Sequence, residues 1–115
     1  MKSIPGYSNY KVASNGEIWV FINGKSLHTL TPQKNNWGYL RIRLSSDLGK
    51  WRFILVHRLV AEAYLPNIDM LPEVNHKDGD KLNNDVSNLE WCTSSQNRIH
   101  QHALKKKALD IGAMV

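Results

Sequence analysis

Alternating apolar and polar residues predict antiparallel strands through residues 8–54. Two Asn-Gly pairs, at 15–16 and 23–24, lie among β-branched and aromatic residues, and this dipeptide supplies the positive φ angles that two-residue hairpins need. A third turn is expected at 35–38. Residues 39–45 then alternate without a break, which predicts a half-buried strand. Its apolar face carries Leu40, Ile42 and Leu44, and its open face carries Tyr39, Arg41, Arg43 and Ser45. A turn at 47–49 and a strand at 50–55 complete this half.

The apolar period changes to that of a helix after residue 55. The apolar residues recur at i, i+3, i+4, i+7 and i+8, which predicts a helix over 56–65 that Pro66 ends. Short strands are predicted at 73–76 and 88–92, on either side of a polar loop. A last helix begins at Thr93 or Ser94, both good N-caps, and continues to about Lys106. Because its apolar pattern is thin, we expect it to lie on the surface.

This order of elements predicts an α+β fold. An N-terminal antiparallel sheet and a helix precede a unit of strand, loop, strand and helix. We expect residues 1–55 to form a β-rich module and residues 56–108 a second part of one compact unit, followed by a tail at 109–115. A chain of 115 residues has room for one modest domain with a core.

Composition and charge narrow the range of functions. The net charge of +5 and the pI near 9.5 favour a polyanionic partner, nucleic acid first, although a basic surface can also serve solubility alone. No run of about 18 apolar residues is present, so we expect no contact with a membrane. The single cysteine, Cys92, excludes an internal disulfide and argues against a structural zinc site of several cysteines.

The stretch from Val74 to Asn97 carries the candidate chemistry. His76 ends the first short strand, and a neutral imidazole with a pKa near ~6.5 can take a proton from water. Asn88 begins the second strand, where its amide oxygen could hold the ring in one tautomer. Asn97 on the last helix and Asn75 beside the histidine add oxygen donors that suit a hard cation such as Mg²⁺.

Hydrolysis of a phosphodiester bond needs such groups. A base must deprotonate water, and a divalent ion can neutralise charge on the phosphate and on the leaving 3′-oxygen. The simpler interpretation is that His76 is a polar surface residue and that the Asn-rich loop, with Asp78-Gly79 and Asn83-Asn84, only makes turns. Spacing alone favours this simpler interpretation over a nuclease.

Several motifs resemble those of the HNH endonucleases, in particular the branch of phage enzymes similar to homing endonucleases. They are VNHKDGDKLNN, NLEW and TSSQN, preceded by the helix-like VHRLVAEAYLPN. IPGYSNYKVASNGEIWV and GYLRIRLS resemble the β-rich module often fused to such nucleases. Together these motifs cover about residues 4–104, and their order and intervals make the resemblance specific.

The resemblance implies a ββα-metal site. In it His76 is the general base, Asn88 orients it, and Asn97 is a metal ligand. Asn75 falls where relatives often carry Asp, the other ligand, and a neutral amide binds Mg²⁺ more weakly than a carboxylate. We expect a divalent ion, Mg²⁺ with Mn²⁺ as a substitute.

Basic residues indicate how the chain would hold DNA. Arg41 and Arg43 share one strand face. We expect them to contact phosphates, because phosphate contacts outnumber base contacts in most protein–DNA complexes. Arg52 is expected to extend this patch, and Lys81 to flank the loop. On the last helix Arg98 would clamp a phosphate. His100 would contact the scissile phosphate, or is equally well a solvated helix histidine.

These observations predict a metal-dependent HNH endonuclease acting on double-stranded DNA. One site handles one strand, so a monomer should nick, and cutting both strands would need a dimer or two visits. We expect a monomer or weak dimer. The resemblance implies a phage or intron element acting in a bacterial cytoplasm. Two alternatives stay open: a DNA-binding module whose site has decayed at Asn75, or an accessory nuclease subunit beside phage packaging or replication proteins. RNA binding is a distant third.

Overall fold

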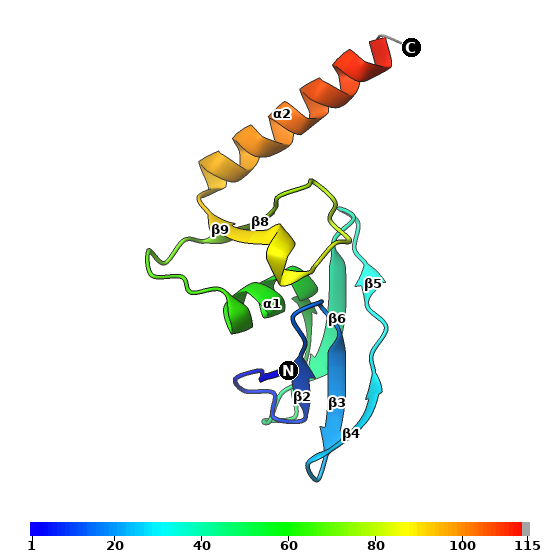
Figure 1. The fold of residues 1–115 in the computed structure, drawn as a ribbon. Coiled ribbons are helices and arrows are strands. Elements are labelled where there is room, and N and C mark those ends of the chain that lie inside the picture. Colours follow the sequence, from blue (N-terminus) through cyan, green and yellow to red (C-terminus); the bar gives the residue numbers. More distant parts are fainter. Residues whose placement is uncertain (114–115) are drawn as a thin grey trace.

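The computed structural model describes the backbone of residues 1–113 and the side chains of residues 1–104. Three small antiparallel sheets and two helices form an α+β fold, as predicted (Figure 1). In chain order the elements are β1 (Lys2–Ser3), β2 (Tyr10–Val12), β3 (Ile18–Ile22), β4 (Lys25–Thr29), β5 (Gln33–Lys34), β6 (Leu40–Ser45), β7 (Trp51–Leu55), α1 (Val56–Tyr64), β8 (Glu73–His76), a 3₁₀ turn (Val86–Asn88), β9 (Leu89–Cys92) and α2 (Ser94–Ala113).

The first sheet has the order β1-β2-β3-β4, and its two hairpins differ. Asn23 and Gly24 both have positive φ, and Ile22 pairs with Lys25, so this Asn-Gly pair makes the two-residue hairpin that the sequence predicts. The pair at 15–16 does not. It lies in a five-residue loop between Val12 and Ile18, because the Asn15 side chain accepts the backbone N–H of Glu17 and closes an Asx turn.

The second sheet, β5-β6-β7, follows the predicted alternation. Ile42 and Leu44 are buried, whereas Arg43 between them is exposed. The register pairs Arg43 with Phe53 and Leu44 with Arg52. Residues paired across two strands share a face, so this register also decides which side each residue of β7 occupies.

Helix α1 joins the sheets to the last hairpin through one hydrophobic core. Val56, Leu59 and Val60 are almost fully buried, and Leu65 caps the helix just before Pro66. The core combines residues from both halves of the chain: Ile4, Tyr10, Val12, Ile18, Ile42, Leu44, Val56, Leu59, Val60, Ala61, Val74 and Leu89. The division at residue 55 remains a prediction, and this core runs across it.

The C-terminal part is a ββα unit, in which β8 pairs with β9 and α2 follows (Figure 1). Leu104 of α2 packs on Gly79 so closely that a Cβ there would lie 2.7 Å from the leucine. The predicted end of this helix near Lys106 is wrong, because α2 continues to Ala113 through good helix formers such as alanine, leucine and lysine. The tail predicted at 109–115 is therefore helical to residue 113, and residues 114–115 lie outside the described part. No helix within that part combines the length and the apolar character needed to cross a membrane.

Candidate active site in the ββα unit

His76 is the last residue of β8. Its side chain is buried, with 5% of its surface exposed. Its Nε2 lies 2.8 Å from Oδ1 of Asn84. Because an amide oxygen only accepts hydrogen bonds, Nε2 carries the proton and Nδ1 keeps its lone pair. In the described part of the chain no hydrogen bond engages Nδ1, so this nitrogen is free to take a proton.

The residue that holds the imidazole is therefore Asn84, whereas the sequence analysis expected Asn88. The Asn88 oxygen accepts the backbone N–H of Asp78 at 3.1 Å, and its nitrogen donates to Asp78 Oδ1 and to the Asn83 carbonyl, both at 2.9 Å. Asn88 thus ties the two ends of the loop together. Asn84 was interpreted as a turn residue because nothing in its local sequence distinguishes it from Asn83.

The N-terminal sheet positions Asn84. The backbone N–H of Val86 donates to the Ser14 carbonyl at 2.8 Å, which docks the end of the loop between β8 and β9 on the β2–β3 loop. Gly16, with φ of +94°, lies against Asn84, and a Cβ on it would come within 3.1 Å of the Asn84 Cβ. The orientation of His76 therefore depends on Ser14 and Gly16, which lie far earlier in the chain.

Two further rings surround the imidazole. His57, from the first turn of α1, meets His76 edge-on with 4.9 Å between ring centroids, and Tyr39 lies 5.9 Å from His76. Burial, with smaller effects from the charges of His76 and Arg58, lowers the pKa of His57 to about 4. His57 is therefore neutral near pH 7 and packs beside His76. The contact between His57 and His76 has no local signal in the sequence, because it exists only after α1 packs under β8.

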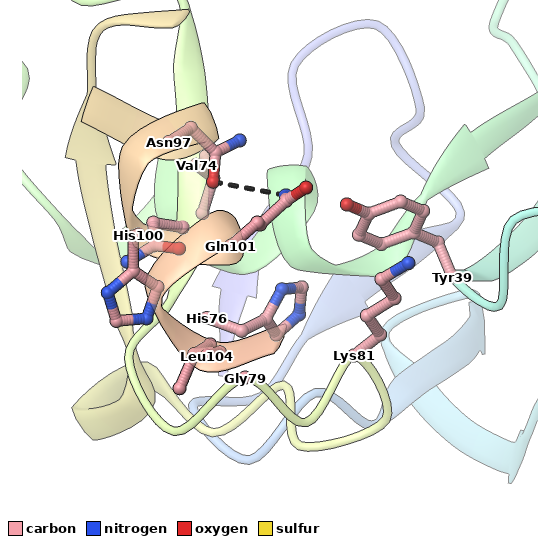
Figure 2. A pocket seen from close by; sticks show the side chains of 10 residues that line it. Tyr39, Val74, His76, Gly79, Lys81, Asn97, His100, Gln101 and Leu104 are labelled. Atoms are coloured by element: carbon pink, nitrogen blue, oxygen red, sulfur yellow. Dashed lines mark hydrogen bonds between the residues drawn. The ribbon is translucent and has the colours of Figure 1, made fainter. Parts of the chain in front are cut away.

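Asn75 and Asn97 are buried beside His76, and each donates its amide N–H to a carboxylate. Asn75 Nδ2 lies 2.8 Å from Glu90 Oε1, and Asn97 Nδ2 lies 3.0 Å from Glu73 Oε1. The Asn97 oxygen also accepts a long hydrogen bond of 3.3 Å from Gln101, drawn in Figure 2. Hydrogen bonds from Ser94 and Asn97 lower the pKa of Glu73 below its usual range, so it is ionised at neutral pH.

One pocket brings together half of the predicted site residues (Figure 2). Its lining includes these predicted residues: Asn75, His76, Lys81, Asn97 and His100. The Lys81 ammonium donates to the Trp37 carbonyl at 2.9 Å and lies over the Tyr39 ring. Nε2 of His100 is buried and lacks a hydrogen-bond partner among the described residues. Asn88 is absent from the lining of this pocket, which fits its place under the loop.

Comparison with known proteins agrees with this geometry. A family model described as HNH endonuclease matches residues 55–99. The chain is 39% identical over 97 residues to the DNA endonuclease I-HmuI of Bacillus phage SP01, which is 84% of this chain and 53% of that protein. It is 35% identical over 100 residues to the H-N-H endonuclease F-TflII of Escherichia phage T5, 85% of this chain and 50% of that protein.

A solved structure, described as DNA binding and cleavage by the HNH homing endonuclease I-HmuI, matches with a TM-score of 0.75 and 37% identity. The match covers 97% of this chain and 65% of that chain. Residues 55–99 belong to the HNH endonuclease family, and most of the chain is similar to proteins of that family. The chain spans about half the length of the two curated relatives named above.

The pocket of this HNH domain is lined by amides and not by a cluster of acidic metal ligands. Within the described residues, no three His, Cys, Asp or Glu side chains gather so that they could hold an ion. The donors at the pocket are instead the amide oxygens of Asn75 and Asn97, whose N–H groups are already taken by carboxylates. Neutral oxygen donors fit a hard divalent cation such as Mg²⁺. The unpartnered Nε2 of His100 beside the same pocket is a further donor that a ligand could satisfy.

The predicted DNA contacts of the HNH protein lie in two places. Arg41 stacks on Phe53, with its guanidinium carbon 4.0 Å from the ring centroid, and Arg43 stacks on Trp51 at 5.1 Å. Both rings are more than half exposed, so this open face of β6 and β7 is a ladder of arginines and aromatic rings. The arginines of this face were predicted from the sequence, and their aromatic partners were not.

Arg52 does not share that face. It pairs with Leu44, so it lies on the opposite side of the sheet from Arg41 and Arg43, and the expectation that it extends their patch is wrong. Arg98 is exposed on α2, one residue after the buried Asn97. The pocket that holds His76 is lined from α2 by Asn97, His100, Gln101 and Leu104 and not by Arg98, and Arg41 and Arg43 belong to the separate sheet.

Proposed function

We propose that the chain is an endonuclease that hydrolyses phosphodiester bonds in double-stranded DNA and depends on a divalent metal ion. The observation that supports this best is the His76 imidazole, whose Nε2 is held by Asn84 while Nδ1 is free, in one pocket with Asn75 and Asn97. The names of the related HNH proteins support the same conclusion.

The proposed mechanism assigns proton transfer to His76. Nδ1 takes the proton of the attacking water, and Asn84 holds the ring and stabilises the imidazolium that results. A divalent ion bound by the amide oxygens of Asn75 and Asn97 would supply positive charge to the phosphate and to the leaving 3′-oxygen. Lys81 and His100 line the pocket, where they can bind phosphate oxygens, and the exposed Arg98 of α2 would bind phosphate outside its lining.

The ladder of Arg41 and Arg43 on Phe53 and Trp51 would hold the duplex away from the cut. Stacking fixes the plane of each guanidinium, so less side-chain entropy is lost when it binds phosphate. With one imidazole base per chain, each binding event cuts one strand. A monomer is therefore a nickase, and cutting both strands needs a dimer or two binding events. Its relatives from phages suggest that it works in the cytoplasm of a bacterial host.

The test is supercoiled plasmid incubated with Mg²⁺ or Mn²⁺. We expect wild-type protein to produce nicked circles, and His76→Ala to lose nicking by a factor of about 10² to 10⁴ while it still binds DNA. His28→Ala is the matched control, because His28 is exposed on β4 and outside the pocket. A wild type that binds DNA and never nicks would contradict the proposal.

A second candidate function has an observation of its own. The two proposed ligands are neutral amides, and no carboxylate lines the pocket, so the chain could bind DNA without cutting it. Binding without nicking at any Mn²⁺ concentration favours this DNA-binding module. Nicking that appears only after phage packaging or replication proteins are added favours an accessory subunit of a larger nuclease.

A further inference from the structure

The amide–carboxylate pairs at Asn75 and Asn97 explain how a site without an acidic ligand could hold a divalent cation. We propose that Glu90 and Glu73 supply the negative charge of the metal site without contacting the ion. Each would act through its hydrogen bond to the asparagine that would bind the ion. This inference rests on the proposed metal dependence, and it adds two positioning residues that the family motif does not include.

The register of the last hairpin makes the first pair. Asn75 of β8 is directly opposite Glu90 of β9, and their side chains meet at 2.8 Å. Facing positions of adjacent antiparallel strands bring side chains to within contact, so this pairing is built into the sheet and needs no loop rearrangement. Asn75 is 5% exposed, which means that its amide is presented by the fold in one orientation.

The second pair ties the helix to the same face. Glu73 is two residues before Asn75 on β8, so both lie on one side of the hairpin, and Asn97 of α2 reaches Glu73 at 3.0 Å. Each amide thus directs its N–H group to a carboxylate, and both asparagines line the same pocket; the Asn97 oxygen also accepts the long hydrogen bond from Gln101, which lines that pocket too. Both proposed ligands are therefore hydrogen-bonded to a carboxylate, Asn75 from β8 and Asn97 from α2.

The chemistry of the amide group makes this arrangement effective. When an amide donates its N–H to a carboxylate, the hydrogen bond polarises the group and makes its oxygen a better donor to a cation. The two carboxylates also bring two formal negative charges next to a doubly charged ion. Partners of this kind, bonded to a metal ligand, typically change metal affinity by about 10- to 100-fold.

The same geometry explains why residue 75 is not an acid. An aspartate there would place its carboxylate against Glu90, and two like charges at hydrogen-bond distance repel each other. Asn75→Asp alone should therefore destabilise the hairpin. Asn75→Asp combined with Glu90→Gln reverses the pair, with the acid inside and the amide outside, and restores both the hydrogen bond and the charge.

The experiment measures Mn²⁺ binding to the free protein by the loss of the electron paramagnetic resonance signal of the free ion. We expect Glu90→Gln to weaken binding about 10- to 100-fold with a melting temperature close to wild type, since glutamine still accepts the Asn75 hydrogen bond. Glu73→Gln should behave alike. The double variant Asn75→Asp/Glu90→Gln should recover wild-type affinity or exceed it. Glu62→Gln, on the exposed side of α1, is the matched control.

Two results would overturn the inference: Mn²⁺ affinity of Glu90→Gln and Glu73→Gln equal to that of wild type, or wild-type affinity equal to that of Asn75→Ala/Asn97→Ala. Plasmid nicking by the wild type alongside either result would leave the nuclease proposal standing. Conversely, a protein that binds Mn²⁺ as expected and never nicks would contradict the proposed function while this inference holds.

Discussion

Asn84 accepts a hydrogen bond from Nε2 of His76 at 2.8 Å, and this bond decides which imidazole nitrogen can act as the base. Asn84→Ala removes the acceptor, so the ring can rotate or change tautomer. We expect single-turnover nicking to fall by about 10² to 10⁴, as for other histidines that lose their orienting partner. DNA binding should be unchanged in a gel-shift assay. Asn84→Asp keeps an acceptor oxygen and should retain far more activity than Asn84→Ala; equal losses in the two would contradict this role.

Asn88 should matter first for stability. Asn88→Ala removes three side-chain hydrogen bonds that join Asp78, Asn83 and the start of β9. We expect the free energy of unfolding to fall by about 1–3 kcal/mol, because the part-buried hydrogen bonds to the Asp78 N–H and the Asn83 carbonyl are lost. Urea unfolding followed by tryptophan fluorescence measures this. An Asn88→Ala protein as stable as wild type would show that the loop is held in another way.

Gly16 links the N-terminal sheet to the active site, and Gly24 provides a matched comparison. Both have positive φ, so an alanine costs about 1 kcal/mol or more at either position. A Cβ at Gly16 meets Asn84, whereas one at Gly24 meets nothing within 4 Å. Gly16→Ala should therefore reduce nicking at temperatures where the protein stays folded, and Gly24→Ala should not. Equal nicking rates in the two variants would show that Gly16 does not position Asn84.

His57 should make the protein less stable in mild acid. Its folded pKa of about 4 is below the ordinary 6.5, so the unfolded state binds more protons between these values, and stability falls as pH drops through that window. From pH 7 to pH 5 the expected loss is about 2 kcal/mol. The groups facing His57 are His76, Tyr39 and Arg58. His57→Phe keeps a ring and should flatten this part of the curve measured by urea unfolding; an unchanged slope would assign it to another group.

The two faces of the second sheet should respond differently to salt. Arg43→Ala removes a guanidinium from the open ladder, so the slope of log affinity against log salt should fall in magnitude by about 1. Arg52→Ala, on the opposite face, should leave the slope unchanged. Fluorescence anisotropy with a labelled duplex at several salt concentrations measures both. A slope that changes in Arg52→Ala and not in Arg43→Ala would place the DNA on the other side.

Local patterns were sufficient for most of the fold. The alternation of Leu40, Ile42 and Leu44 predicted the buried face of β6, and the apolar stripe from Val56 predicted α1. The misplacement of Arg52 was avoidable, because the same period of two assigns it to the face of Ile54. The length of α2 was missed because its apolar pattern was considered and its helix-forming residues were not.

The active site was predictable only in part, for a physical reason. His76, Asn75 and Asn97 stand at strand and helix positions, so their approach to one pocket follows from the order of elements. The partner of His76 lies in a loop with adjacent asparagines, and which amide reaches the ring depends on the docking of Val86 on Ser14. Such a contact between distant segments leaves no periodic signal in the sequence.

The docking of the loop between β8 and β9 on the β2–β3 loop has a consequence for how such proteins diversify. Gene exchange that replaced the residues before 55 with another β-rich segment would also replace Ser14 and Gly16, the backbone surface on which Asn84 rests. One recombination event would then change the DNA preference and also abolish cleavage, unless the incoming segment contained an equivalent loop.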